Sequence, residues 1–169
     1  MSFLAGIVLA VFLISTAKAQ KDMHQDLLVV YYFGATNIGF CTAPDNIEKI
    51  KKLKKDLPLE YDNFRFKFVL ICLDENLEVG LKFIKKYGQW DEIAIGGSYG
   101  NELALNHLNT RELPSLPHIL IFKDTLASGR WNIPVIKRRK LLVDLAGEKE
   151  IGDWIDEGYP ILADKKSRR

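Results

Sequence analysis

Residues 27–41 read LLVVYYFGATNIGFC, and this stretch decides the fold. Its first part, Leu27 to Phe33, is continuously apolar, which is typical of a strand buried on both faces. A short loop then leads to Cys41, and Pro44 stands where proline suits the first turn of a helix. The stretch therefore predicts a buried strand that is followed by a cysteine and a helix.

A second informative stretch, residues 113–124, reads LPSLPHILIFKD. It places Pro117 and His118 directly before an apolar run that predicts a strand, Ile119 to Phe122.

Hydrophobic periodicity predicts strands and helices in alternation along the rest of the chain. The other strands are expected at 64–73, 92–95 and 140–145. The first helix should run from Pro44 to the Leu57-Pro58 pair. The second should be capped by Asp74, bury Leu77, Leu81 and Ile84, and end at Tyr87-Gly88. Two further helices are expected at 102–108 and 148–156. Together these elements predict an α/β fold with a central mixed β-sheet flanked by helices on both faces.

With both stretches in this order, the sequence resembles the thioredoxin-like superfamily over about residues 26 to 158. The first stretch is similar to F-W-A-x-W-C-G-P-C: Ile38 falls on the nucleophilic cysteine and Cys41 on the resolving cysteine. Gly39 and Phe40 fall on the glycine and proline between them. The second stretch is similar to G-I-P-T-L-L-L-F-K-N-G, whose cis-proline faces the cysteine pair and corresponds to Pro117. The resemblance therefore implies that the Leu116–Pro117 peptide bond is cis. The long spacing between the stretches looks most like the periplasmic TlpA-like thioredoxins.

The resemblance implies a fold without its usual chemistry, because the two sulfurs of the family have different tasks. The first attacks a disulfide as a thiolate, and the second resolves the mixed disulfide that results. With Ile38 at the first position, the chain cannot run that cycle unaided. We therefore predict that it binds a protein or peptide, without any cofactor. In redox relatives the backbone before the proline pairs with the substrate as an added strand. The predicted binding groove comprises Ile38, Gly39, Phe40, Leu116, Pro117 and His118.

An enzymatic alternative stays open, in which Cys41 acts as a monothiol thiol-disulfide oxidoreductase. At the start of a helix the thiolate would be stabilised, and His118 could activate it from the proline loop. Against this, Tyr32 occupies the place of the buried acid of redox thioredoxins, and an inert thiol is the plainer interpretation. A peroxiredoxin-like peroxidase, with the pattern P-x-x-x-T-x-x-C, fits less well because Gly34 and Ile38 replace the proline and threonine. Cys72 is expected to be a core thiol, and a disulfide with Cys41 depends on side-chain directions.

The N-terminal segment 1–19 predicts export. Phe3 to Ile14 is an apolar run, and Ala17-Lys18-Ala19 forms a small-residue cleavage site, so the mature chain should begin at Gln20. The run is too short for a typical membrane-spanning helix, so no stable span is expected after cleavage. An uncleaved anchor is the alternative, and either interpretation puts the domain in the periplasm or outside the cell. The thioredoxin-like domain is expected over residues 20–160 and a basic, disordered tail over 161–169.

Composition narrows the remaining function classes. Nearly half of the chain is apolar, and the net charge of +2 argues against a dedicated nucleic-acid binder. Two cysteines in an exported chain do not form a disulfide scaffold, and the three histidines show no metal-ligand spacing, so no metal site is predicted. The basic run Arg138-Arg139-Lys140 is expected to lie in solvent.

Overall fold

The computed structural model describes residues 26–108 and 115–161. The predicted signal peptide, the Leu113-Pro114 pair and the tail from residue 162 onward lie outside the described residues. The predicted tail began one residue earlier, at Ile161. That residue is buried in the core, and its backbone N–H donates to the Tyr61 hydroxyl at 3.0 Å. The folded domain therefore includes Ile161.

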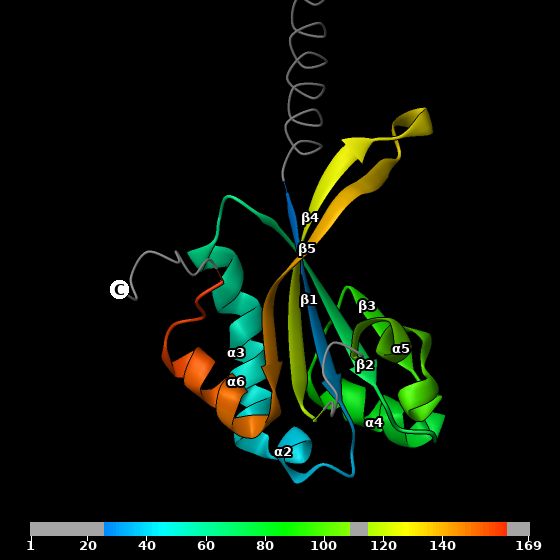
Figure 1. The fold of residues 1–169 in the computed structure, drawn as a ribbon. Helices are drawn as coiled ribbons and strands as arrows, with labels where there is room; N and C mark the ends of the chain where they lie inside the picture. The colour runs from blue at the N-terminus through cyan, green and yellow to red at the C-terminus, as the bar shows by residue number, and fades with distance from the viewer. Residues whose placement is uncertain (1–25, 109–114, 162–169) are drawn as a thin grey trace, which may run out of the picture.

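A five-stranded mixed sheet in the order β3-β2-β1-β4-β5 forms the centre of the molecule (Figure 1). β1, β2 and β3 are parallel, while β4 runs antiparallel to β1 and β5 antiparallel to β4. In chain order the elements are β1 (Leu27–Gly34), α2 (Gly39–Thr42), α3 (Pro44–Glu60), β2 (Arg65–Cys72), α4 (Leu77–Lys86), β3 (Glu92–Ile95), the 3-10 helix η1 (Ser98–Gly100), α5 (Glu102–His107), β4 (His118–Ser128), the 3-10 helix η3 (Arg130–Asn132), β5 (Pro134–Ala146) and α6 (Gly147–Asp156).

Two hydrophobic clusters cover the two faces of the sheet, which confirms the predicted α/β class. The cluster on one face joins alternate β1 residues, among them Val30 and Tyr32, to the inner sides of α3, α4 and α6. The cluster on the other face joins Val29, Tyr31 and Phe33 to α5. Because successive residues of a strand point to opposite faces, the unbroken apolar run of β1 supplies both clusters.

The first helix is longer than predicted, because α3 continues through Pro58 to Glu60. A proline inside a helix removes one hydrogen bond and disfavours the helical conformation of the residue before it. That residue is Leu57, which is fully buried, and its carbonyl still accepts from the Tyr61 N–H at 3.0 Å. Packing of Leu57 in the core thus outweighs the local preference of Pro58 for ending the helix.

The second helix differs from the prediction in its cap and in its buried face. Asn76 is the N-cap and accepts from the backbone N–H groups of Glu78 and Val79, whereas Asp74 caps no helix. Gly80, Phe83 and Ile84 face the core, while Leu77 and Leu81 are half-exposed. A Cβ on Gly80 would lie 2.6 Å from Cδ1 of Ile95 and 3.0 Å from Sγ of Cys72. The missing side chain lets the helix approach the sheet on that side, and helical spacing alone does not reveal it.

The last two strands are much longer than the predicted segments 119–122 and 140–145. β4 and β5 extend together beyond the body of the sheet as a hairpin, with Ser128 opposite Pro134 at its far end (Figure 1). Most of the added residues are polar or exposed, so they lack the alternating burial on which the prediction of strands depends. The final helix agrees with its prediction, and Ile151 and Trp154 are buried.

Candidate functional site

The sheet brings the two informative stretches of sequence together at the same end of its strands. Phe33, near the end of β1, is the register partner of His118, at the start of β4. The loop that follows β1 and the loop that precedes β4 therefore lie at one end of the sheet. Asp74, which follows β2, holds the first loop by accepting hydrogen bonds from the Thr36 backbone N–H and from the Thr36 hydroxyl, the latter at 2.6 Å. The Leu116–Pro117 peptide bond is cis, as expected from the sequence.

Cys41 lies in α2 and is fully buried as a free thiol. Burial raises the pKa of the Cys41 thiol above its ordinary value, and this outweighs the opposing hydrogen bonds from the Ala35 backbone and the Tyr32 side chain. A raised pKa reduces the thiolate fraction at neutral pH, and the thiolate is the reactive form. The environment of Cys41 is therefore that of an unreactive thiol.

Two buried tyrosines contact each other and the backbone of α2. The Tyr32 and Tyr87 hydroxyls are 2.8 Å apart, and the Tyr87 hydroxyl also donates to the Cys41 carbonyl oxygen at 2.6 Å. Burial raises the pKa of both phenols. Both groups therefore stay protonated around neutral pH, so neither is a base that could take a proton from Cys41. They fix the backbone of α2 instead.

His118 is fully buried, and its Nε2 lies 2.8 Å from Oδ1 of Asp144 on β5. Its ring packs edge-on against Phe33. No interaction between His118 and Cys41 is found among the described residues. The histidine thus supports the loop from inside, and the structure does not show the activation of Cys41 that the sequence allowed.

Cys72 is a core thiol, as predicted, and it is not joined to Cys41 by a disulfide. Its Sγ donates to Oδ2 of Asp74 at 3.1 Å, and burial raises the pKa of this thiol to about 12. Asp74 therefore connects Cys72 to the β1 loop. Among residues 26–108 and 115–161, no group of three or more His, Cys, Asp or Glu side chains could hold a metal ion.

The six residues of the predicted groove divide into an outer and an inner set. Gly39 is exposed, Ile38, Phe40 and Leu116 are half-buried, and Pro117 and His118 are buried. Ile38 and Leu116 both pack partly against the α5-side core cluster. We call Ile38, Gly39, Phe40 and Leu116 the loop surface. The loop surface is apolar and partly exposed, whereas the Cys41 thiol is buried.

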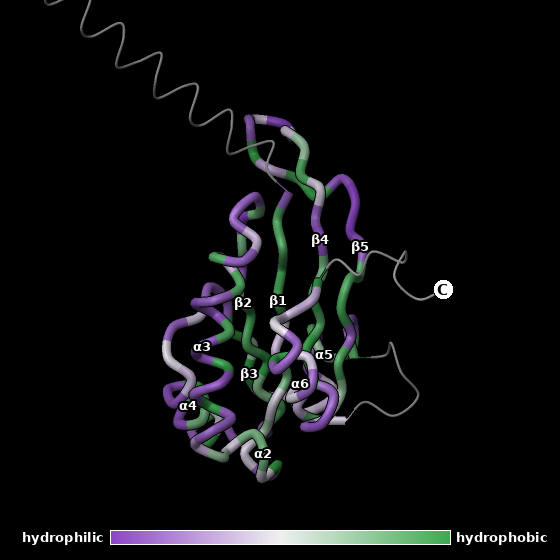
Figure 2. The backbone as a smooth tube through the Cα atoms, turned by 90° about the vertical axis from the view of Figure 1, so that its left-hand side faces the viewer, coloured by the Kyte–Doolittle hydropathy of each residue, from purple (hydrophilic) through white to green (hydrophobic). Residues whose placement is uncertain are grey.

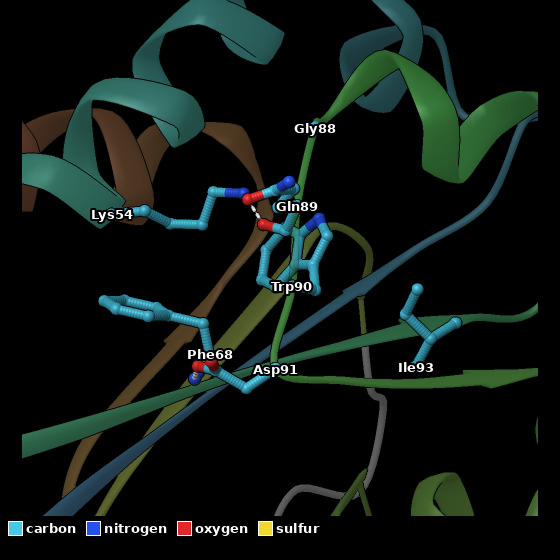
Figure 3. A pocket seen from close by; sticks show the side chains of 7 residues that line it. All are labelled: Lys54, Phe68, Gly88, Gln89, Trp90, Asp91 and Ile93. Atoms are coloured by element: carbon cyan, nitrogen blue, oxygen red, sulfur yellow. Dashed lines mark hydrogen bonds between the residues drawn. The ribbon is translucent and has the colours of Figure 1, made fainter.

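A pocket that sequence reasoning missed lies between α3 and the segment before β3 (Figure 3). It has a volume of about 570 Å³. The Lys54 ammonium donates to the carbonyl oxygens of Tyr87 and Gln89 and lies 4.1 Å from the centre of the Trp90 ring. Burial lowers the pKa of Lys54 to about 8. Lys54 is one of five lysines between residues 49 and 55, and only the fold separates it from the others.

The arrangement defines a thioredoxin-like fold: a mixed sheet flanked by helices on both faces, with the loop after β1 and the proline loop at one end. The chain thus has a thioredoxin-like fold. No protein-family model matches the sequence, and no curated protein matches it either.

Solved structures with a similar fold include three bacterial proteins. A thiol:disulfide interchange protein from a Bacteroides species is 12% identical, with a TM-score of 0.48 and coverage of 88% of this chain and 82% of that one. The thioredoxin domain of a thiol-disulfide oxidoreductase from Bacteroides vulgatus is 12% identical, with a TM-score of 0.42 and coverage of 83% and 84%. A thiol:disulfide interchange protein, DsbE, from Chlorobium tepidum is 12% identical, with a TM-score of 0.44 and coverage of 83% and 81%.

Thiol labelling of the native protein should be slow. At about pH 8, a disulfide reagent such as Ellman's should modify Cys41 and Cys72 at least about 100-fold more slowly than in the unfolded chain, because the native thiols must first become exposed. Raised thiol pKa values also lower the thiolate fraction at a given pH, so reaction should need more alkaline conditions than for an exposed cysteine. Rapid labelling of one thiol in the folded protein, lost in a Cys41→Ser variant, would contradict the inert assignment.

Proposed function

We propose that this thioredoxin-fold protein is exported and binds a protein or peptide segment at the loop surface, without dithiol exchange. The observation that carries the proposal is the contrast between neighbouring positions at the end of β1. Ile38, at the place of the attacking sulfur, is half-exposed and apolar, whereas Cys41 is fully buried. A partner that approaches this end of the strands would therefore contact the Ile38 side chain and could not reach the sulfur of Cys41.

The loop surface suits an extended apolar polypeptide. Ile38, Phe40 and Leu116 offer partly buried side chains whose outer atoms lose water when they are covered, and full burial of such a side chain contributes about 1.5–3 kcal/mol. The Thr36–Asp74 hydrogen bonds and the Tyr87–Cys41 hydrogen bond hold the loop and α2 from two sides. A preorganised loop loses less conformational freedom on binding, which favours recognition over chemistry.

Binding can be tested with reduced, carboxymethylated α-lactalbumin, an extended apolar chain whose thiols are blocked. Fluorescence anisotropy of the labelled probe should show saturable binding to the wild-type protein. An Ile38→Asp/Leu116→Asp variant should bind at least about tenfold more weakly, since tenfold corresponds to about 1.4 kcal/mol and two apolar contacts are replaced by charges.

The matched control is Leu59→Asp, which places the same charge on an exposed leucine of α3. It should bind within about twofold of the wild type, because substitutions away from the site have small effects. Equal binding by all three proteins would show that the loop surface is not the site. A complex with an unblocked peptide that dithiothreitol releases, and that a Cys41→Ser variant cannot form, would favour the monothiol oxidoreductase instead.

A further inference from the structure

The β4–β5 hairpin projects beyond the body of the sheet, and its β5 strand is exposed at every residue from Pro134 to Lys140 (Figure 1). Residues 131–140 are all exposed, although four of them are large and apolar. We call the four apolar residues the hairpin tip: Trp131, Ile133, Val135 and Ile136. Val135 and Ile136 are consecutive in β5, so they point to opposite faces of the ribbon. Hydrocarbon is therefore presented on both sides.

The backbone of the tip turns in a conformation that is costly for a bulky residue. Trp131 has φ 65° and ψ 24°, and Asn132 has φ 59°. A left-handed conformation is rare for large side chains and tends to occur where function requires it. Here it accompanies an indole that is 81% exposed, followed by Ile133 at 60%. Single exposed apolar residues need no explanation, but a cluster at the end of a projecting element indicates an interaction surface.

Basic side chains follow the apolar tip along the same hairpin. Between Asp124 and Asp144 the chain has five basic residues and no acidic one, although the whole chain is almost neutral. Figure 2 shows this hydrophilic stretch of β5 next to the apolar residues toward the hairpin end. A hollow of about 260 Å³ on the ribbon is lined by Lys123, Thr125, Arg138, Lys140 and Leu142. Within the described residues, neither Arg138 nor Lys140 has a carboxylate partner.

We propose that the hairpin docks on an anionic phospholipid surface, with the hairpin tip in the headgroup region and the basic hollow on lipid phosphates. Exposed tryptophan and aliphatic side chains next to lysine and arginine are the chemistry of membrane interfaces. A lipid layer can surround the hairpin tip, whose apolar side chains lie on both faces of the ribbon. A flat protein surface would cover only one of these faces. Each basic residue near an anionic bilayer strengthens binding about fivefold.

The path of the chain is consistent with this orientation. Leu27 pairs with Asp124 at the base of the hairpin, so the segment that contains the apolar run Phe3 to Ile14 joins the domain on that side. The residues between Ile14 and Leu27 span at most about 40 Å when extended. Were the run retained as an anchor, it would hold the hairpin within reach of the bilayer.

The test places an environment-sensitive fluorophore at the tip of the full-length protein through an Ile133→Cys substitution. The native thiols are buried, so labelling is selective. Vesicles that contain phosphatidylglycerol should shift the emission of the label to the blue and raise its intensity, while pure phosphatidylcholine vesicles should not. The readout is local to the hairpin, so insertion of the N-terminal segment alone would not produce it. High salt should weaken the effect.

Two matched charge variants, each combined with the labelled site, decide the result. Arg138→Gln/Lys140→Gln should weaken binding to the anionic vesicles about 10- to 30-fold. Lys49→Gln/Lys55→Gln, which removes the same charge from the exposed face of α3, should stay within about twofold. An unchanged emission with anionic vesicles, or equal losses in both variants, would overturn the proposal. A blue shift without lipid that grows with protein concentration would also overturn it and assign the tip to contacts between copies.

Discussion

An Ile38→Cys variant should reduce insulin disulfides with dithiothreitol as the electron source, while the wild-type protein should not accelerate the reaction. Position 38 is the N-cap of α2, three residues before Cys41, and its side chain is half-exposed. A sulfur there would restore an attacking thiol beside the buried Cys41, which could then resolve the mixed disulfide. Turbidity of the released insulin chains measures the rate.

The gain should fall short of an efficient oxidoreductase by a factor of about 10² to 10⁴, the usual contribution of a positioned base. The resemblance places Tyr32 at the position of that base, and burial raises the pKa of its phenol, so it stays protonated at neutral pH. The control is Ile38→Ser. Serine is similar in size to cysteine but has no sulfur, so this variant should be inactive. Turnover by the wild type that disappears in Cys41→Ser would instead establish a monothiol enzyme. A folded Ile38→Cys protein that neither turns over nor forms a disulfide with Cys41 would show that the alignment of this loop is wrong.

Replacing Arg139 with methionine should lower the free energy of unfolding by about 3–5 kcal/mol, since it leaves a buried carboxylate without its partner. Asp124 is 1% exposed, and both of its oxygens accept from the Arg139 guanidinium, at 2.7 Å each. The two residues face each other across β4 and β5 at the base of the hairpin. The hydrogen bond to Asp124 also raises the pKa of Arg139, so the guanidinium stays charged even in alkaline solution.

Urea unfolding followed by circular dichroism measures this loss. Arg138→Met is the matched control, because Arg138 is adjacent and exposed, and its replacement should change the unfolding free energy by less than about 0.5 kcal/mol. An Asp124→Asn/Arg139→Met double variant should recover part of the loss, since it removes the unpaired charge. Similar unfolding free energies for Arg139→Met and Arg138→Met would show that the ion pair does not stabilise the fold. Arg139 is exposed, as expected for the basic run, but the sequence did not reveal its ion pair with the buried Asp124.

Local patterns in the chain were sufficient for the central part of the fold. The apolar run of β1, Pro44 at the start of α3 and the apolar spacing of Ile47, Ile50 and Leu53 each depend on interactions within a few residues. The resemblance added the placement of the two loops at the same end of the strands and the cis bond before Pro117. Of the predicted groove residues, Ile38, Phe40 and Leu116 reach the surface, whereas His118 is buried, and their binding role stays a prediction.

The sequence by itself determined the α/β class, the position of the two loops, and the absence of a C-x-x-C pair, because each follows from residue identity and short-range spacing. Only the tertiary structure shows that Cys41 is fully buried, and this burial raises the pKa of its thiol. It also decided which face of α4 is buried, because Gly80 acts through the space that it leaves for Ile95. The partner of Arg139 and the exposure of Trp131 depend on how far β4 and β5 pair beyond the sheet. Burial and charge pairing across strands are not encoded in local periodicity.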